Sequence, residues 1–228
     1  MKIVNPNLEG DYHIHSIDFS DGSDTIEDIV RLAGQIGLKE IAITDHSQAA
    51  LDKMGLNKRA DRKSISKWKN THNNVKVIFG IEGDILNEQG DICQDIQGET
   101  SDFLTLSAHS YVYSGKPENI TEAYINAIKK HKQIIKFISH PCSKYFSKFV
   151  DIKRLIDEAN KNCIPMEFDY MHLANENKDL AKLQVEQAQT MLKNCDRIYV
   201  NSDAHNLHEL RTARENGLKY LRKNCFLK

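Results

Sequence analysis

The sequence predicts an α/β fold in which strands and helices alternate along one domain. Seven short apolar runs alternate with longer stretches of helical periodicity. Several of these runs are β-branched and almost continuously apolar, which is typical of parallel sheets covered on both faces. The chain has 228 residues, a length that one α/β barrel can occupy. No repeat, low-complexity tract or linker divides residues 1–228, so we expect a single domain that is either a parallel barrel or an open doubly wound sheet.

The strands are predicted where the apolar runs fall. Their ranges are 10–15, 40–45, 75–81, 103–108, 134–139, 164–168 and 197–202. A Gly-x-Gly-x-x-Gly turn does not follow the first of them, so a dinucleotide-binding fold has no support.

Helical periodicity occupies most of the intervals between these strands. The predicted helices are 24–36, 118–131, 151–162, 175–194 and 206–217. In the first, Asp24 with Glu27 three residues later predicts the N-terminal cap, and Gly37 predicts the end.

Composition excludes several classes of protein. The 31 basic and 32 acidic residues nearly cancel, so there is no general attraction to nucleic acid or to an anionic membrane. The five cysteines form no Cys-x-x-Cys pair, which favours reduced thiols and a cytoplasmic location. The first nine residues lack the apolar core of a signal peptide, and no apolar run approaches the roughly 20 residues of a membrane span.

Potential metal ligands follow the predicted strands. His13 and His15 alternate on the first strand, so both imidazoles point to the same side. A His-x-His triplet alone is as often structural as functional. However, another candidate ligand follows this first strand, and residues of the same kind follow each of the six remaining strands. These are Asp21, Asp45, His46, Glu82, His109, His140, Glu167, Asp169, Asp203 and His205. The carboxyl ends of barrel strands meet at one rim, so these residues would become neighbours in space.

The number of ligands argues for more than one ion. Six imidazoles and at least three carboxylates exceed what one tetrahedral ion needs, and mixed nitrogen and oxygen ligands suit Zn, Mn or Fe. Two or three ions that share a carboxylate can activate water and bind phosphoryl oxygens.

Short motifs recur in a fixed order along nearly the whole chain. They are Asp11-Tyr-His13-Ile-His15-Ser, Ser20-Asp21-Gly22, Ala42-Ile43-Thr44-Asp45-His46-Ser47, Gly80-Ile81-Glu82, His109, His140-Pro141 and Ser202-Asp203-Ala204-His205. As an ordered set they resemble the polymerase and histidinol phosphatase (PHP) family. The resemblance implies a distorted (β/α)7 barrel with a trinuclear metal centre at its rim. An amidohydrolase barrel also begins with His-x-His, but it usually needs a bridging lysine on the fourth strand, and none lies near His109.

The resemblance also implies three ion sites that share the bridging carboxylate Glu82. Their ligand groups are His13, His15, Glu82 and Asp203; Asp21, His46 and His205; and Glu82, His109 and His140. Asp21 stands where some members of the family have histidine, and a carboxylate there favours Mn or Fe over Zn.

The expected reaction is hydrolysis of a phosphate monoester of a small molecule, with attack on phosphorus by a metal-activated hydroxide. The candidate catalytic residues are Asp45, Glu82 and Asp203. Asp45 precedes a predicted ligand and would either orient an imidazole or serve only as a turn residue. Glu167 and Asp169 have the same two interpretations.

Cations at the rim are expected to hold the substrate. The segment after His46 is long and basic, and it would either cover the substrate as a lid or form a solvated helix face. The candidate substrate-binding residues are Lys58, Arg59, Arg62, Lys144, His172 and Arg211.

Two other functions remain open at this point. The spacing of the Thr44-Asp45-His46-Ser47 and Gly80-Ile81-Glu82 motifs resembles the PHP domain of family-X DNA polymerases, which suggests a metal-dependent 3'-5' exonuclease or nucleotide phosphodiesterase. The near-neutral charge and the lack of a polymerase or helix-hairpin-helix segment in these residues count against it. A non-catalytic scaffold stabilised by metals is the third interpretation, which the complete ligand set disfavours.

Overall fold

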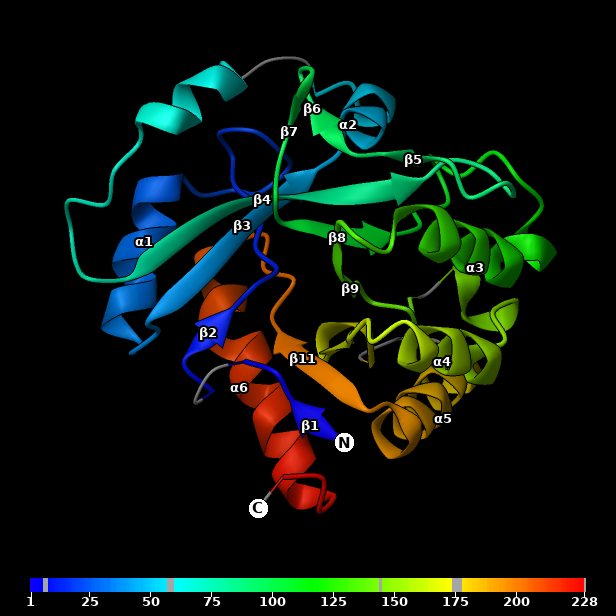
Figure 1. Cartoon of the computed structure of the whole chain (residues 1–228). Helices are drawn as coiled ribbons and strands as arrows, with labels where there is room; N and C mark the ends of the chain where they lie inside the picture. Colours follow the sequence, from blue (N-terminus) through cyan, green and yellow to red (C-terminus); the bar gives the residue numbers. More distant parts are fainter. Residues whose placement is uncertain (6–7, 57–59, 144, 174–177, 228) are drawn as a thin grey trace.

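A curled sheet of parallel strands forms the centre of the computed structural model, which describes residues 1–5, 8–56, 60–143, 145–173 and 178–227 (Figure 1). In spatial order the strands are β2 (Gly10–Asp11), β3 (Glu40–His46), β4 (Lys76–Ile85), β8 (Leu104–Ser107), β9 (Ile135–Ile138), β10 (Met166–Asp169), β11 (Arg197–Asn201) and the edge strand β1 (Lys2–Ile3). Every neighbouring pair in this order is parallel. The predicted strands are confirmed, although β2 is shorter than its apolar run.

The two ends of the curled sheet meet beyond β2 and β11. Ile14 and Ala204 form an isolated parallel bridge, and the amide of His15 donates to the carbonyl of Ala204 at 2.9 Å. The chain that continues β2 therefore pairs with the chain that continues β11. This closure confirms the predicted barrel and accounts for its distortion, because one seam is a single bridge rather than a ladder.

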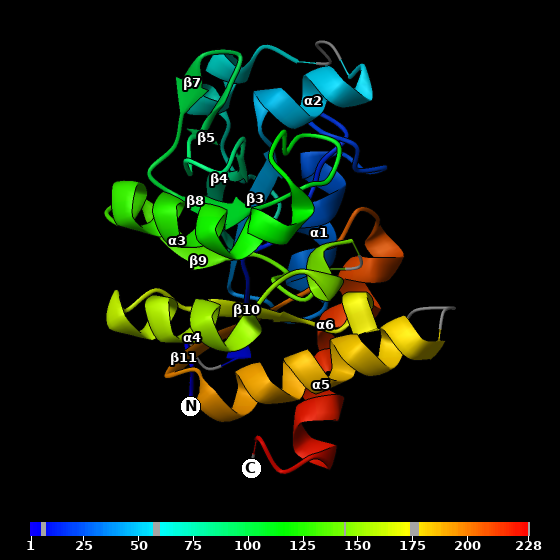
Figure 2. The same ribbon diagram turned by 90° about the vertical axis from the view of Figure 1, so that its right-hand side faces the viewer.

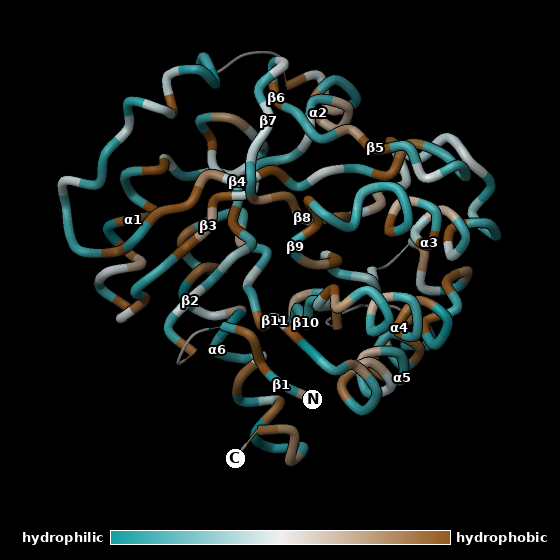
Figure 3. Tube along the Cα trace, viewed as in Figure 1, coloured by the Kyte–Doolittle hydropathy of each residue, from teal (hydrophilic) through white to brown (hydrophobic). Residues whose placement is uncertain are grey.

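Helices cover the outside of the sheet (Figures 1 and 2). They are α1 (Ile26–Gln35), α3 (Ile120–His131), α4 (Ile152–Lys161), α5 (Lys178–Asn194) and α6 (Leu207–Lys223). Brown and teal segments alternate along them in Figure 3, as expected of amphipathic helices that bury one face. The helix α6 runs six residues further than predicted, to Lys223.

The cap of α1 differs from the prediction. Thr25, not Asp24, precedes the helix in an extended conformation, and its hydroxyl accepts from the amide of Asp28. Asp24 instead accepts from the amide of Leu207 at 2.9 Å, which ties this loop to the start of α6. Gly37 ends the helix as predicted, with a positive φ of 83° that favours glycine.

Alternation along β3 sorts its side chains between two environments. Ile41 and Ile43 pack with α1 in a cluster on the outer side of the sheet. Ala42 belongs to a separate cluster with Tyr12 and Phe137 in the barrel interior. By the same alternation, His46 faces the interior and Asp45 the outer side.

Short elements fill the remaining connections. Between β3 and β4 lie α2 (Gln48–Met54) and the 3-10 helix η2 (Arg62–Lys67), so much of the basic segment is helical. The strand β5 (Ile92–Cys93) pairs antiparallel with β4, and β6 (Asp95–Ile96) with β7 (Glu99–Thr100). Three further 3-10 turns are η3 (Pro117–Asn119), η4 (Phe146–Lys148) and η5 (Met171–Leu173). Among the described residues, no helix is both long and apolar enough to span a membrane.

Candidate metal centre

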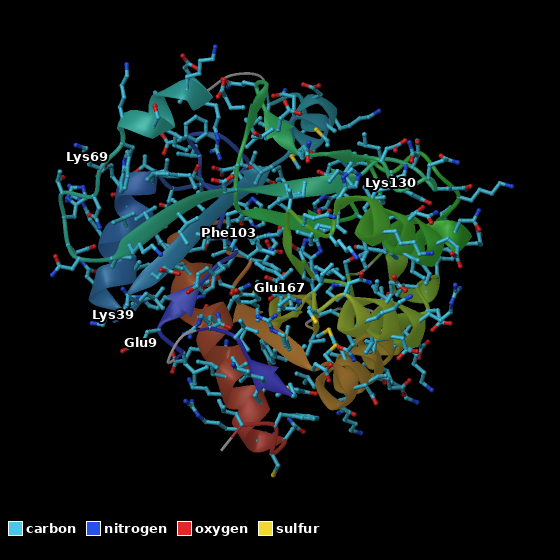
Figure 4. All side chains as sticks on the ribbon, in the orientation of Figure 1. Glu9, Lys39, Lys69, Phe103, Lys130 and Glu167 are labelled. Carbon is cyan, nitrogen blue, oxygen red and sulfur yellow. The ribbon has the colours of Figure 1, made fainter. Side chains whose placement is uncertain are left out.

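The predicted ligands converge at the carboxyl ends of the barrel strands. They extend from the segment after β2, from the ends or interiors of β3 and β4, and from the segments after β8, β9 and β11. Most of these side chains are buried, unlike most charged residues of the chain. In Figure 4, Glu167, which lies beside His13, is near the middle of the view, whereas Lys39 and Lys69 are near its edge.

Glu82 is at the centre of the cluster. Its carboxylate is fully buried on β4, and imidazoles approach both of its oxygens. Oε1 lies 2.7 Å from Nε2 of His140 and 3.3 Å from Nε2 of His13. Oε2 lies 2.9 Å from Nδ1 of His46 and 3.6 Å from Nε2 of His15. The fifth imidazole belongs to His109, at 3.9 Å.

Two further carboxylates lie on either side of this centre. Oδ1 of Asp203 is 3.3 Å from Nε2 of His13 and 3.2 Å from Nε2 of His15. Oδ1 of Asp21 is 3.5 Å from Nε2 of both His46 and His205. The structure therefore brings all nine predicted ligands together.

Electrostatics keep the carboxylates ionised. Burial by itself raises the pKa of Glu82, but His13, His109 and the other imidazoles outweigh it, and the pKa lies well below its ordinary value. The pKa of Asp203 is lowered in the same way, by histidines against burial. Burial, followed by the neighbouring His205 and His46, lowers the pKa of His15 to about 3, so this imidazole is neutral. Anionic oxygens beside neutral imidazole nitrogen are the donors that divalent metals bind.

Several buried atoms that could bind a metal make no well-directed hydrogen bond among the described residues, although other atoms of the cluster lie near some of them. They are Nε2 of His13, Nδ1 of His15, Nδ1 of His46, Oε2 of Glu82 and Nδ1 of His140. Such atoms are costly to bury unless something satisfies them. Donor atoms also gather within 4.8 Å of one another in groups such as His15, Asp21, His46 and His205 or His13, Glu82 and His140. The donor set therefore fits divalent metal ions.

A second layer of carboxylates orients the imidazoles. Both oxygens of Glu167 lie 3.0 Å from Nδ1 of His13, and Oε2 also accepts from the amide of His140. Asp84 lies 2.6 Å from Nδ1 of His109 and accepts from the hydroxyl of Ser47. Carboxylates in this position fix the ring and the tautomer of a metal-binding histidine. Glu167 was among the candidates predicted from the sequence, but Asp84 was not. Asp84 lies two residues after Glu82 on the same strand, so alternation could have placed both carboxylates on one face.

His172 lies at the edge of the cluster. Its Nε2 is 3.1 Å from Oδ2 of Asp203 and 3.3 Å from Oδ2 of Asp169, and it gathers with His140 and Asp203 in a further group of donors. Burial raises the pKa of Asp169 to about 8. Against burial, Asp169 and Asp203 raise the pKa of His172 to about 9.

An exposed tyrosine lies next to the cluster. The ring of Tyr111 stacks on the imidazole of His109, with centroids 5.3 Å apart and planes 23° apart. Burial, and after it Asp84, Glu82 and more distant carboxylates of the cluster, raise the pKa of Tyr111 above its ordinary range. Sequence reasoning missed this residue, because a tyrosine two positions after a ligand carries no pattern of its own.

The structure does not bring Asp45 together with Glu82 and Asp203, and it places this residue in the structural role that was the other interpretation. Its side chain lies on the face of β3 opposite to His46, where Oδ1 accepts from the amide and the hydroxyl of Ser16 at 2.7 and 3.0 Å. Asp45 therefore fixes the turn that follows His15, and it does not face the cluster.

Of the predicted substrate-binding lysines and arginines, the structure describes only Arg62 and Arg211, and it places neither at the rim. Arg62 is 3% exposed, donates to the carbonyl of Gly80 at 2.7 Å, lies over the ring of Phe19 and faces Asp45 at 3.6 Å, so it is a structural cation. Arg211 lines a hollow on α6 beside Leu38, which precedes β3 at the end opposite to His46, so the structure does not bring Arg211 to the cluster. Lys58, Arg59 and Lys144 lie outside the described residues.

We expect Arg62→Met to lower the free energy of unfolding by about 3 kcal/mol, because it leaves the buried Asp45 carboxylate without its cation. Urea unfolding of the variant measures this. Arg62→Met with Asp45→Asn should recover part of the loss, since no charge is then left unpaired. Equal losses in the single and double variants would contradict the pairing.

A family model described as PHP domain matches residues 11–205. The chain belongs to the PHP domain family. The matched range begins just before His13 and ends at His205, so it includes every ligand position of the cluster. The resemblance inferred from the ordered motifs is confirmed.

Curated relatives of this PHP domain include two kinds of protein. The DNA polymerase/3'-5' exonuclease PolX of Bacillus subtilis (strain 168) is 27% identical over 89% of this chain, which spans 35% of its length. A protein of Shewanella piezotolerans named "Probable phosphatase" is 31% identical over 70% of this chain and 62% of its own length. The chain thus spans about a third of the first relative and three fifths of the second.

Solved structures share the fold of this PHP domain. One is histidinol phosphate phosphatase from Lactococcus lactis, complexed with zinc, L-histidinol and phosphate. It superposes with a TM-score of 0.51 and 12% identity, and the match covers 95% of this chain and 94% of the other. At this identity the likeness shows the fold.

Proposed function

We propose that this PHP domain is a metal-dependent phosphatase that hydrolyses phosphate monoesters of small molecules. The observation that carries the proposal is the Glu82 carboxylate, which is buried between imidazoles on both of its oxygens. Beside it, the buried Nδ1 atoms of His15 and His140 have no hydrogen-bond partner among the described residues. A carboxylate in this position suits a bridging ligand of a centre with two or three ions. The names of the phosphatase relative and of the Lactococcus lactis structure support the same reaction.

The proposed ions are Zn, Mn or Fe, in the three ligand groups that share Glu82. The grouping of donor atoms supports these sets, with His15 close enough to join Asp21, His46 and His205 as well. The carboxylate of Asp21 places one more negative charge on this second group than a histidine would, which favours Mn or Fe there.

The residues of the chain prepare the site before substrate arrives. Glu167 at Nδ1 of His13 leaves Nε2 directed at Glu82 and Asp203, and Asp84 does the same for Nε2 of His109. Bound ions would lower the pKa of the attacking water and compensate the charge of the phosphoryl oxygens. Burial of Glu82 and His13 excludes bulk water from the inner side of the centre, which strengthens these electrostatic interactions.

A second candidate function is exonuclease or phosphodiesterase activity on nucleic acid, because the alignment with PolX covers 89% of this chain. The phosphatase is favoured because the described residues give the carboxylates of Asp21, Glu82 and Asp203 only histidine ion-pair partners, with no lysine or arginine beside them to contact a polyanionic strand.

A substrate panel tests the proposal. Manganese-loaded protein is incubated with p-nitrophenyl phosphate, histidinol phosphate, nucleoside monophosphates and labelled single-stranded DNA. We expect release of phosphate from the small esters that a chelator abolishes. His13→Ala should lose activity and bound metal, whereas His208→Ala, an exposed histidine on α6, should keep both. Shortening of the DNA without release of phosphate from the small esters would favour exonuclease activity. If no substrate in the panel is hydrolysed, a non-catalytic scaffold would be favoured.

A further inference from the structure

The mouth of the metal centre carries an exposed aromatic ring in a fixed position. Tyr111 follows the candidate ligand His109 by two residues and is 42% exposed. The turn that carries it is closed by the carbonyl of His109, which accepts from the amides of Val112 and Tyr113 at 3.0 and 2.9 Å. The side chains of Val112 and Tyr113 are buried, so they anchor the turn to the body of the protein.

The imidazole of His109 covers one face of the Tyr111 ring, and Asp84 holds that imidazole in place at 2.6 Å. Within the described ranges, no other ring contact and no hydrogen bond of the phenol hydroxyl is present. The platform is therefore preorganised, and ordering it on binding costs little.

Among the described residues beside the centre, Tyr111 is the exposed aromatic ring that stacks on a candidate ligand, whereas His172 is held by Asp169 and Asp203. Ions would neutralise the phosphoryl group, but they do not distinguish one alcohol from another. In the described part of the chain, Arg62 is buried away from the cluster, and the carboxylates of the centre pair with histidines. An exposed aromatic face beside a phosphoryl site binds a flat, conjugated group by stacking.

We propose that Tyr111 is a specificity-determining platform on which the planar aromatic group of the substrate's alcohol stacks while its phosphoryl group lies at the metal centre. This inference rests on the proposed phosphatase function and narrows its substrates to phosphate monoesters whose alcohol bears an aromatic ring. Nucleoside 5'-monophosphates are the probe for this class.

A matched pair of esters isolates the stacking. Adenosine 5'-monophosphate and ribose 5-phosphate present the same primary phosphate ester on the same sugar, and they differ in the base. Values of kcat and KM are measured for both with manganese-loaded protein. Dissociation constants are measured by calorimetry with the phosphonate analogues of both, in which a methylene group replaces the ester oxygen and prevents turnover.

The variants are Tyr111→Ala, which removes the ring, and Tyr111→Phe, which keeps it. Tyr145→Ala is the matched control, because Tyr145 is also exposed, at 51%, and its ring contacts the rings of Phe146 and Phe149 rather than a candidate ligand. Bound metal is counted in each variant, so that a loss of ions is not mistaken for a loss of stacking.

We expect Tyr111→Ala to weaken the adenosine analogue and to raise the KM for its ester by about tenfold to a hundredfold, with the ribose compounds and the metal content unchanged. Tyr111→Phe and Tyr145→Ala should behave as the unsubstituted protein. Equal losses on both esters, or equal affinity of the unsubstituted protein for both analogues, would overturn the inference. Absence of phosphate release from every ester, with the difference in analogue affinity intact, would instead overturn the proposed function.

Discussion

Glu82→Gln is expected to lower kcat/KM for phosphate monoesters by more than about 100-fold, together with a loss of bound metal. The substitution keeps the size of the side chain but replaces a carboxylate that faces five imidazoles with a neutral amide. An amide has one oxygen and cannot bridge two ions as a carboxylate does. Because Glu82 is shared between ligand groups, its loss affects more than one ion.

The measurement is elemental analysis of the purified variant beside steady-state kinetics. Glu215→Gln is the control, since Glu215 is exposed on α6 and pairs with Lys219 away from the cluster. A Glu82→Gln variant with full metal content and full activity would refute the bridging assignment.

Removal of metal is expected to lower Tm by at least about 8 °C at pH 8, and addition of Mn should restore it. One ion present at a thousand times its Kd stabilises the folded state by about 4 kcal/mol, and each kcal/mol corresponds to roughly 2–4 °C in a chain of this size. Differential scanning calorimetry with and without a chelator measures the effect. An unchanged Tm would show that the ions, if bound, contribute nothing to the fold.

The difference in Tm between metal-loaded and chelated protein should grow between pH 7 and pH 9. Burial by itself lowers the pKa of His13 and of His46, but nearby carboxylates outweigh it and raise both well above their ordinary value. In chelated protein these imidazoles therefore hold protons that ions must displace, so metal affinity rises with pH.

The stability of the chelated protein should change in the opposite direction. A raised histidine pKa in the folded state contributes stability that is fully present below about pH 6.5 and is lost as pH rises through the folded value. Tm should thus fall from pH 7 to pH 9 without metal and fall less, or rise, with metal. Parallel slopes in the two series would contradict the proton linkage.

The sequence predicted the barrel and the ligand set because both depend on short-range patterns. Apolar runs define strands such as 40–45, and a polar residue at the end of such a run lies at the barrel rim whatever the helices outside it do. His13 and His15 needed nothing more than the alternation of a strand to point together.

The positions of Asp45, Arg62 and Arg211 could not be predicted in the same way, because they depend on contacts between segments that are distant in the sequence. Asp45 could have been assigned to the outer face by alternation with His46, but its partners Ser16 and Arg62 come from two other segments. The basic composition around Arg62 predicts solvent exposure, and nothing local indicates that one arginine is buried against a carboxylate seventeen residues earlier. The position of Arg211 was difficult to predict for a similar reason. Its distance along α6 from His205 does not reveal which end of the barrel it faces.

The single bridge between Ile14 and Ala204 has a consequence for how the centre is assembled during synthesis. It joins donors that are 188 positions apart along the chain, such as His15 and Asp203. Contacts of such long range form late and slowly. We therefore expect a nascent polypeptide that lacks β11 to hold fewer than the full set of candidate ligands, so that metal loading would report a barrel completed from its first strand to its last.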